Sequence, residues 1–257
     1  MLSTGAGTAS AGAGGSPGSR TRRAIMATPS VRSRGGAAPL VVESISEQLY
    51  SILCDRITTG VYAPGSRIDP QAIATEFGVS RTPVRDTLVR LEHDRLVETR
   101  PRSGTFVTRP SRQDVHEVCQ LRKGLEWLAT GVAAEAMPLE QIADLREEAV
   151  AALRAAEQGD YEPFFASDTR IHHEIIAHTD NSRLIAARES VEPFVYWLRV
   201  LGATGPHRLA GSTRRHLEIL DAMAARDIAA AQEAAALHLT EVEEWTLADM
   251  ASHDIVT

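Results

Sequence analysis

From Ser111 onward the chain shows almost only the hydrophobic periodicity of amphipathic helices. The predicted helices span residues 111–136, 138–158, 161–178, 182–201, 206–225 and 228–250. Proline, glycine, aspartate and asparagine residues mark the short breaks between them, as expected at helix ends. Because six helices joined by short loops pack as an antiparallel bundle, the sequence predicts an all-α C-terminal part.

The segment before this bundle has a different order of elements. Amphipathic spacing predicts a helix over residues 44–60, a short one over 70–77 and a third over 80–94. Two β-prone stretches follow, at 96–99 and 105–108, separated by a Pro-Arg-Ser-Gly turn. Three helices followed by a small β-hairpin wing is the order of a winged helix-turn-helix, so the whole chain is predicted to be mainly α.

Charge divides the chain into three parts. Residues 1–42 hold five arginines and no acid, and their Gly-, Ala- and Ser-rich composition predicts a disordered basic leader. This leader is an arm that adds nonspecific DNA affinity, a dispensable leader, or an overextended start with translation beginning at Met26. Residues 43–110 have no net charge, whereas residues 111–257 carry −12. We therefore expect any contact with nucleic acid to come from the first 110 residues. Within them, residues 80–109 carry a net charge of +3.

The composition excludes several classes of protein. The chain is 43% hydrophobic and 24% charged, which is enough apolar residues to build packed cores. No stretch approaches the ~18 apolar residues of a membrane-spanning helix, and the N-terminus lacks the apolar core of a secretory signal. Cys54 and Cys119 are too few for a disulfide framework or a multi-thiolate metal site. We therefore expect a cytoplasmic protein with no membrane partner.

The break between the second and third predicted helices suits a DNA-binding turn. Gly78 permits the positive φ of a tight turn, and Ser80 is a natural N-cap for the following helix. Pro83 falls in the first turn of that helix, where its missing N–H costs little.

On the third helix one apolar stripe faces the core, formed by Val84, Leu88 and Leu91. The side chains of Arg81, Thr82 and Arg85 then point away from it. Such a helix N-terminus offers donors for phosphates and for guanine edges in the major groove. Without further context, an amphipathic helix with solvated arginines would explain the same pattern.

The context is a resemblance to a known family. The string GVSRTPVRDTLVRLEHDRLV, followed by RSGTFV, closely resembles the DNA-binding domain of GntR-family transcription regulators over about residues 44–109. The positions that this resemblance implies in operator binding are Arg81, Thr82, Arg85 and Gly104. Arg81 and Arg85 would be the main base contacts, and Gly104 would approach the minor groove at the wing tip. Some relatives carry an arginine where this chain has Gln71, so no DNA contact is assigned there.

Four polar residues in the helical part have spacings that suit shared coordination. Asp168 and His172 are four residues apart, hence on one helix face, whereas His173 points about a quarter-turn away. His216 and His238 each lie eleven residues from the break at Asp227. If two antiparallel helices turn there, these two histidines stand at the same height on facing helices.

A second resemblance connects these positions. The segments DTRIHHEI and RRHLEILDAMAARDIAAAQEAAALHL resemble the FCD-type ligand-binding domain of the FadR-like GntR group, over about residues 115–245. In many members of that group the matching Asp and three His bind a divalent metal. The resemblance therefore implies a metal centre of Asp168, His172, His216 and His238. Three imidazoles and one carboxylate suit Zn²⁺, Ni²⁺ or similar ions.

The same resemblance suggests an effector site beside the metal. Arg122, in LRKGLE, matches a common arginine of the first helix in this domain and could clamp a small carboxylate bidentately. The alternative is a salt bridge between Arg122 and Glu126 at i+4. The aromatic side chains of Trp127, Tyr196 and Trp197 either line this pocket or belong to the core.

Together these patterns predict a repressor or activator that binds double-stranded operator DNA as a homodimer and responds to a small carboxylate. Residues 43–110 would form its DNA-binding domain and residues 111–257 its effector and metal-binding domain. One alternative is an enzyme built on the metal, but no HExxH motif or paired general base supports it. The other is a regulator whose metal is purely structural.

Overall fold

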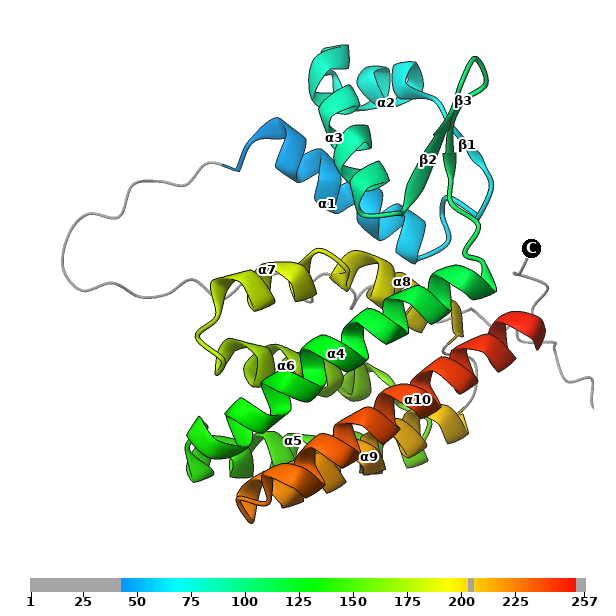
Figure 1. The fold of residues 1–257 in the computed structure, drawn as a ribbon. Coiled ribbons are helices and arrows are strands. Elements are labelled where there is room, and N and C mark those ends of the chain that lie inside the picture. Colours follow the sequence, from blue (N-terminus) through cyan, green and yellow to red (C-terminus); the bar gives the residue numbers. More distant parts are fainter. Residues whose placement is uncertain (1–42, 203–205, 253–257) are drawn as a thin grey trace, which may run out of the picture. The chain divides into compact units, whose positions relative to one another are not determined.

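The computed structural model describes residues 43–202 and 206–252, so the predicted leader at residues 1–42 lies outside the described residues. Three helices come first, as the sequence predicts, and Figure 1 shows them together above the helical bundle. Their bounds are α1 (Ile45–Thr58), α2 (Pro70–Phe77) and α3 (Arg81–His93). Ser44 caps α1 through a complete capping box with Glu47.

The turn between α2 and α3 depends on Gly78. This residue ends α2 with φ +64°, a left-handed conformation that glycine adopts without strain. The Val79 N–H then donates back to the Ala74 carbonyl over 3.0 Å, which closes the end of the helix. Ser80 occupies the N-cap position of α3, as predicted, although its side chain makes no capping hydrogen bond.

The wing contains one strand more than the sequence predicted. The strands are β1 (Arg67–Ile68), β2 (Val97–Arg100) and β3 (Gly104–Val107), in the order β1-β3-β2 with both pairings antiparallel. The prediction of a hairpin alone was therefore incomplete. A two-residue strand is too short to show alternation in the sequence, and β1 is defined only by its pairing with β3.

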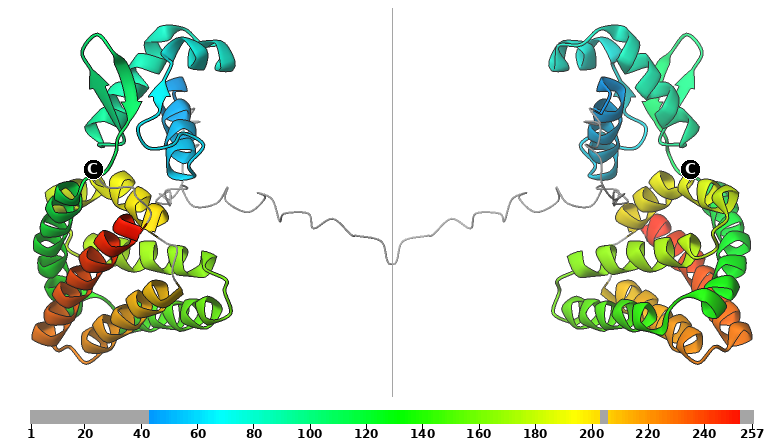
Figure 2. Two further views of the ribbon diagram at one scale, coloured as in Figure 1. Left: turned by 90° about the vertical axis from the view of Figure 1, so that its right-hand side faces the viewer. Right: turned by 90° about the vertical axis from the view of Figure 1, so that its left-hand side faces the viewer.

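The remaining helices form the predicted all-α part. They are α4 (Arg112–Ala136), α5 (Leu139–Glu157), α6 (Glu162–Ala177), α7 (Ser182–Glu189), α8 (Glu192–Gly202), α9 (Pro206–Ala224) and α10 (Ile228–Ser252). Helices α4 and α10 lie side by side, α9 packs against both, and α5 lies against α6 and α9 (Figures 1 and 2). None of the described helices is long and apolar enough to cross a membrane.

One predicted helix is in fact two. The periodicity predicted a single helix over 182–201, but α7 ends at Glu189 and α8 begins at Glu192. Pro193 explains the break, because it has no N–H to continue the hydrogen-bond ladder of α7 and fits best in the first turn of a new helix.

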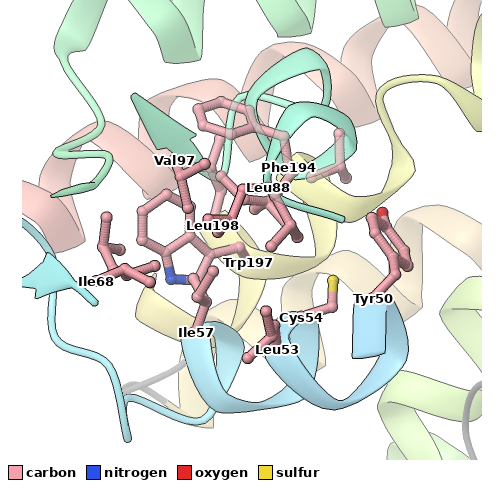
Figure 3. Packing of buried hydrophobic residues seen from close by; sticks show 14 of the residues in the cluster. Tyr50, Leu53, Cys54, Ile57, Ile68, Leu88, Val97, Phe194, Trp197 and Leu198 are labelled. Carbon is pink, nitrogen blue, oxygen red and sulfur yellow. The ribbon is translucent and has the colours of Figure 1, made fainter. Parts of the chain in front are cut away.

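The buried apolar residues form two clusters. The larger joins α1, α3 and the sheet to α8, and Figure 3 shows the Trp197 indole of α8 beside Ile57 of α1 and Val97 of β2. Trp197 is fully buried in this cluster. The second cluster lies within α4, α5, α6, α7, α9 and α10. The first three helices with their small sheet therefore share one core with helix α8.

We expect Trp197→Ala to lower the free energy of unfolding by about 3–5 kcal/mol, because it removes a fully buried indole and leaves a cavity. Trp127→Ala is the matched control: this indole is 48% exposed, and its loss should cost less than about 1 kcal/mol. Urea denaturation followed by circular dichroism measures both. Equal losses would show that Trp197 does not contribute to the core as described.

Candidate metal centre and nucleic-acid interface

Helices α9 and α10 bring two histidines together, as the symmetric spacing about Asp227 predicted. The chain reverses between Ala224 and Ile228, where the Asp227 carboxylate caps α10 by accepting from the Ala230 N–H over 3.0 Å. His216 of α9 and His238 of α10 then face each other, with their Nε2 atoms 3.2 Å apart. Both rings are buried, at 1% exposure.

Helix α6 adds His172 and Asp168 to this pair. One ligand atom from each of His172, His216 and His238 lies within 4.8 Å of the others. Asp168 Oδ1 is 3.7 Å from His216 Nε2 and 4.0 Å from His172 Nε2. Three helices thus bring together all four residues that the sequence singled out, while His173 is exposed.

The orientation of the His172 ring is fixed by Glu126 of α4. His172 Nδ1 is 2.7 Å from Glu126 Oε2, which directs Nε2 of the same ring toward the other histidines. Glu126 also accepts from Arg122 Nε over 2.7 Å and from Arg188 Nε over 3.1 Å. Burial raises the pKa of the Glu126 carboxyl, but Arg122 and His172 outweigh it and hold the pKa well below its usual range.

Asp168 is held from the opposite side by Arg199 of α8. The Asp168 Oδ2 and Arg199 Nη1 atoms are 2.9 Å apart, so Oδ1 is left facing the histidines. Burial raises the pKa of this carboxyl, but Arg199 and the neighbouring histidines reverse the effect and lower the pKa below its usual range. The Asp168 carboxylate is therefore ionised and could serve as an oxygen ligand.

His216 and His238 could serve as neutral nitrogen ligands. Burial lowers the pKa of His216 to about 3 and that of His238 well below its usual range. His238 Nδ1 is buried and has no hydrogen-bond partner among the described residues. Ligands bonded to one ion at about 2 Å lie about 3–4 Å from each other, which matches this group. The residues therefore fit a divalent metal of nitrogen and oxygen preference.

Two cavities adjoin the cluster. One of about 30 Å³ is lined by Asp168, His238 and three arginines, Arg122, Arg199 and Arg208. A second, of about 90 Å³, is lined by His172, Arg188 and Glu192 among others. The first has room for only a few waters, so an organic ligand would have to displace the side chains around it. Arg122 forms the ion pair with Glu126 that the sequence offered as the alternative to an effector clamp, and it also lines the cavity.

The three aromatic side chains considered as pocket residues do not line this cavity. Trp197 belongs to the core shared with the DNA-binding fold, and Trp127 is 48% exposed on α4.

The predicted DNA-contacting residues stand on the exposed side of α3. Val84, Leu88 and Leu91 are buried, as the apolar stripe predicted. Arg81 and Thr82 are exposed in the first turn of α3, and Arg85 is exposed one turn further. No ion pair within residues 43–202 and 206–252 engages Arg81 or Arg85, so both guanidinium groups keep their charge free for phosphates or bases.

Gly104 lies where β3 leaves the wing turn. It pairs with Arg100 across the hairpin and has φ +113°, which side chains rarely allow. A Cβ at this position would also stand 3.2 Å from Arg67 Nε. Arg67 and the turn residue Arg102 are exposed beside it. These two arginines extend the basic surface of the wing, and sequence reasoning did not single them out.

Two family models match the chain. The one described as bacterial regulatory proteins, gntR family, matches residues 45–107, and the one described as FCD domain matches residues 117–241. An HTH-type transcriptional regulator from the TAR-I ttuE-ttuC′ intergenic region of Agrobacterium vitis is 31% identical over 131 residues, which are 50% of this chain and 77% of that protein. The chain belongs to the gntR family of bacterial regulatory proteins.

Other relatives of this GntR regulator support the same family assignment and fold. The HTH-type transcriptional repressor RspR of Escherichia coli is 26% identical over 205 residues, covering 79% of this chain and 89% of that protein. The solved structure of E. coli McbR/YncC shares the fold, with a TM-score of 0.64 and 22% identity over 78% of this chain and 96% of that one. These families and relatives are transcription regulators, which excludes the enzyme alternative.

Sequence reasoning missed the charged residues that surround the cluster of Asp168, His172, His216 and His238 in this GntR regulator. They are Glu126 as a ring-orienting group, Arg188, Arg199 and Arg208. One signal was present: Arg199 is a lone charge within the apolar segment FVYWLRVL, and a charged residue at a buried helix position needs a partner.

The buried histidines predict acid sensitivity of the metal-free protein. Their folded-state pKa values lie below the unfolded value of about 6.5, so the unfolded chain takes up more protons and stability falls as the pH drops below 6.5. With chelator present, the free energy of unfolding should fall by about 2 kcal/mol between pH 6.5 and 5.5. Urea denaturation at each pH measures this.

His216→Gln should reduce that pH dependence to about half, because one of the two imidazoles whose pKa is lowered no longer titrates. His173→Gln, which alters an exposed neighbour, should leave the dependence unchanged. The same pH dependence in His216→Gln as in the wild type would contradict the assignment.

Proposed function

We propose that this GntR regulator binds operator DNA through α3 and the wing, and that a divalent metal with a small carboxylate effector modulates that binding. Residues 43–110 would be the DNA-binding domain and residues 111–257 the sensing domain. Because the partner is operator DNA, the protein would act in the cytoplasm. The observation that carries the proposal is helix α8, which contacts both the metal-ligand cluster and the core of the DNA-binding fold.

For DNA, the proposed contacts are Arg81, Thr82 and Arg85 in the major groove, with Gly104 of the wing at the minor groove. The exposure of all three α3 side chains and the free charge of the two arginines support this. Arginine can donate two parallel hydrogen bonds to guanine O6 and N7, which makes Arg81 and Arg85 the proposed base contacts.

For the metal, the proposed ligands are Asp168, His172, His216 and His238, and the proposed ions are Zn²⁺ or Ni²⁺. Three neutral imidazoles and one ionised carboxylate favour borderline ions over Mg²⁺ or Ca²⁺, which prefer oxygen ligands. The Glu126–His172 pair resembles the carboxylate–histidine arrangement common behind metal ligands.

For the effector, charge balance supports an anion. Four arginines around the cluster face four carboxylates, in the pairs formed by Arg122, Arg188, Arg199 and Arg208 with Glu126, Glu192, Asp168 and Asp249. A divalent cation added to this balanced set leaves an uncompensated positive charge, which a carboxylate would neutralise. Arg122 is the proposed clamp, since it lines the smaller cavity and its Nη2 lies 3.5 Å from His172 Nε2.

For coupling, we propose that α8 carries the signal. Arg199 holds Asp168 in the metal-ligand cluster, and Trp197, two residues earlier, is buried beside Ile57 of α1 (Figure 3). A shift of Arg199 when an effector enters the cavity would move a helix whose indole is packed in the core under the DNA-binding surface.

For oligomeric state, we propose a homodimer formed through α4. Leu121, Trp127 and Leu128 expose 44–48% of their surface on this helix, and Gly124 between them has open space above it. An exposed apolar patch of this kind is typical of an interaction surface, and a near-palindromic operator requires a two-fold partner.

We expect Arg81→Ala and Arg85→Ala each to lower affinity for a selected operator by about 5- to 150-fold, because each removes a bidentate base contact. Affinity for random DNA should change much less. Arg154→Ala, an exposed arginine of α5, is the matched control and should bind as the wild type does. Fluorescence anisotropy at fixed salt measures all four proteins. Unchanged discrimination in both α3 variants would refute the proposed interface.

We expect His216→Ala and His238→Ala to lower Zn²⁺ and Ni²⁺ affinity by at least about 100-fold, because each removes a proposed ligand. His173→Ala should not. Chelator competition measures the affinity, and thermal shift of metal-loaded wild type against small carboxylic acids detects the effector.

The two roles of the metal give different results in these variants. A stable fold that no longer changes operator affinity with effector indicates sensing. Loss of folding in the variants, with effector binding intact where fold remains, indicates a structural metal. Wild-type metal affinity in both variants would refute the site.

A further inference from the structure

Gln71 of α2 contacts Arg81 at the start of α3. The Arg81 Nε–H donates to Gln71 Oε1 over 2.5 Å, across ten residues and the whole turn between the helices. Both side chains are exposed, as are those of Thr82 and Arg85. This is the one hydrogen bond that Arg81 makes with any described side chain.

The Gln71 side chain is itself held in place. The backbone N–H of Gln71 donates to the capping carboxylate of Asp69 over 2.8 Å, which fixes the first turn of α2. Its carboxamide Nε2 lies 3.4 Å from Thr75 Oγ1, and that hydroxyl donates to the Gln71 carbonyl over 2.9 Å. The amide nitrogen is therefore turned toward Thr75 along α2, and the amide oxygen is turned toward Arg81.

This contact leaves the end of the Arg81 guanidinium available. Nε is occupied by Gln71, whereas Nη1 and Nη2 make no hydrogen bond within the described residues. Those two nitrogens are sufficient for a parallel pair of hydrogen bonds to guanine O6 and N7. An arginine held by a neighbour loses less side-chain freedom on binding than a free one. Arg85 has no such partner among the described side chains.

We propose that Gln71 is a specificity-determining positioning residue, which holds Arg81 so that its terminal N–H groups meet one guanine of the operator. This rests on the proposed function, in which Arg81 contacts a base. Gln71 acts through Arg81 and does not itself touch the base. An arginine at position 71 could not serve in this way, because it has no acceptor for the Arg81 Nε–H.

The test compares base discrimination in full-length variants. An operator is first selected from randomised DNA with the wild type, and each guanine in it is then replaced in turn. At one of these guanines, replacement should weaken wild-type binding by about 5- to 150-fold and Arg81→Ala binding by less than about 3-fold, which identifies the Arg81 contact.

At that guanine, Gln71→Ala should reduce discrimination to less than about one third of the wild-type ratio, with affinity for random DNA nearly unchanged. Gln71→Glu keeps an oxygen that accepts from the Arg81 Nε–H, so its discrimination should return to the wild-type ratio that Gln71→Ala loses. If Gln71 only stabilised α2, this recovery would not be expected. Gln158→Ala, an exposed glutamine at the C-terminal end of α5, is the matched control. Thermal melting confirms that each variant is folded.

The double variant Gln71→Ala/Arg81→Ala separates the alternatives. We expect it to discriminate as Arg81→Ala alone does, because Gln71 has nothing left to position. Additional loss in the double variant would show that Gln71 contacts DNA directly and would overturn the proposal. Wild-type discrimination in Gln71→Ala would overturn it as well. Wild-type discrimination in Arg81→Ala would instead refute the base contact on which the proposal rests.

Discussion

The buried carboxylate of Glu126 joins three helices in one set of charged hydrogen bonds. Arg122 of α4, His172 of α6 and Arg188 of α7 all contact its two oxygens. A buried charge is tolerated only when hydrogen bonds and opposite charges compensate it. The contacts to the two carboxylate oxygens of Glu126 therefore hold α4, α6 and α7 together. The direction of the His172 ring, and with it the convergence of the three histidines, follows from that arrangement. The position of the histidine cluster thus depends on the contacts of Glu126 behind it.

The sequence predicted the cluster of Asp168, His172, His216 and His238 but not the residues that hold it in place. Asp168 and His172 share a helix face, and His216 and His238 are equidistant from a turn at Asp227, so sequence spacing implied that each pair meets. The family resemblance implied that the two pairs come together. The roles of Glu126 and Arg199 depend on which helices become neighbours, which periodicity does not specify. The three helices of the DNA-binding fold were predicted because caps and breakers mark their ends.

The errors have equally local causes. The strand β1 has two residues, so no alternation could reveal it, and it exists because β3 offers a free edge for pairing. The division of 182–201 into α7 and α8 follows from Pro193, whose weight was overlooked in an otherwise continuous helical pattern. Because of that break, α8 is a separate short helix and not an extension of α7. Trp197 and Arg199 both lie on it.

The small volume of the cavity beside Asp168 has a consequence for sensitivity. The proposed effector would bind only those molecules in which Arg122, Arg199 and Arg208 have moved apart, which we call the open fraction. Its apparent dissociation constant would then equal the intrinsic constant divided by the open fraction. If one molecule in a hundred is open, the apparent affinity is about a hundredfold weaker than the contacts alone would give. For the proposed effector, a small open fraction would raise the concentration that the response requires. Its response threshold can then be changed by substitutions that alter the open fraction without touching the bound ligand.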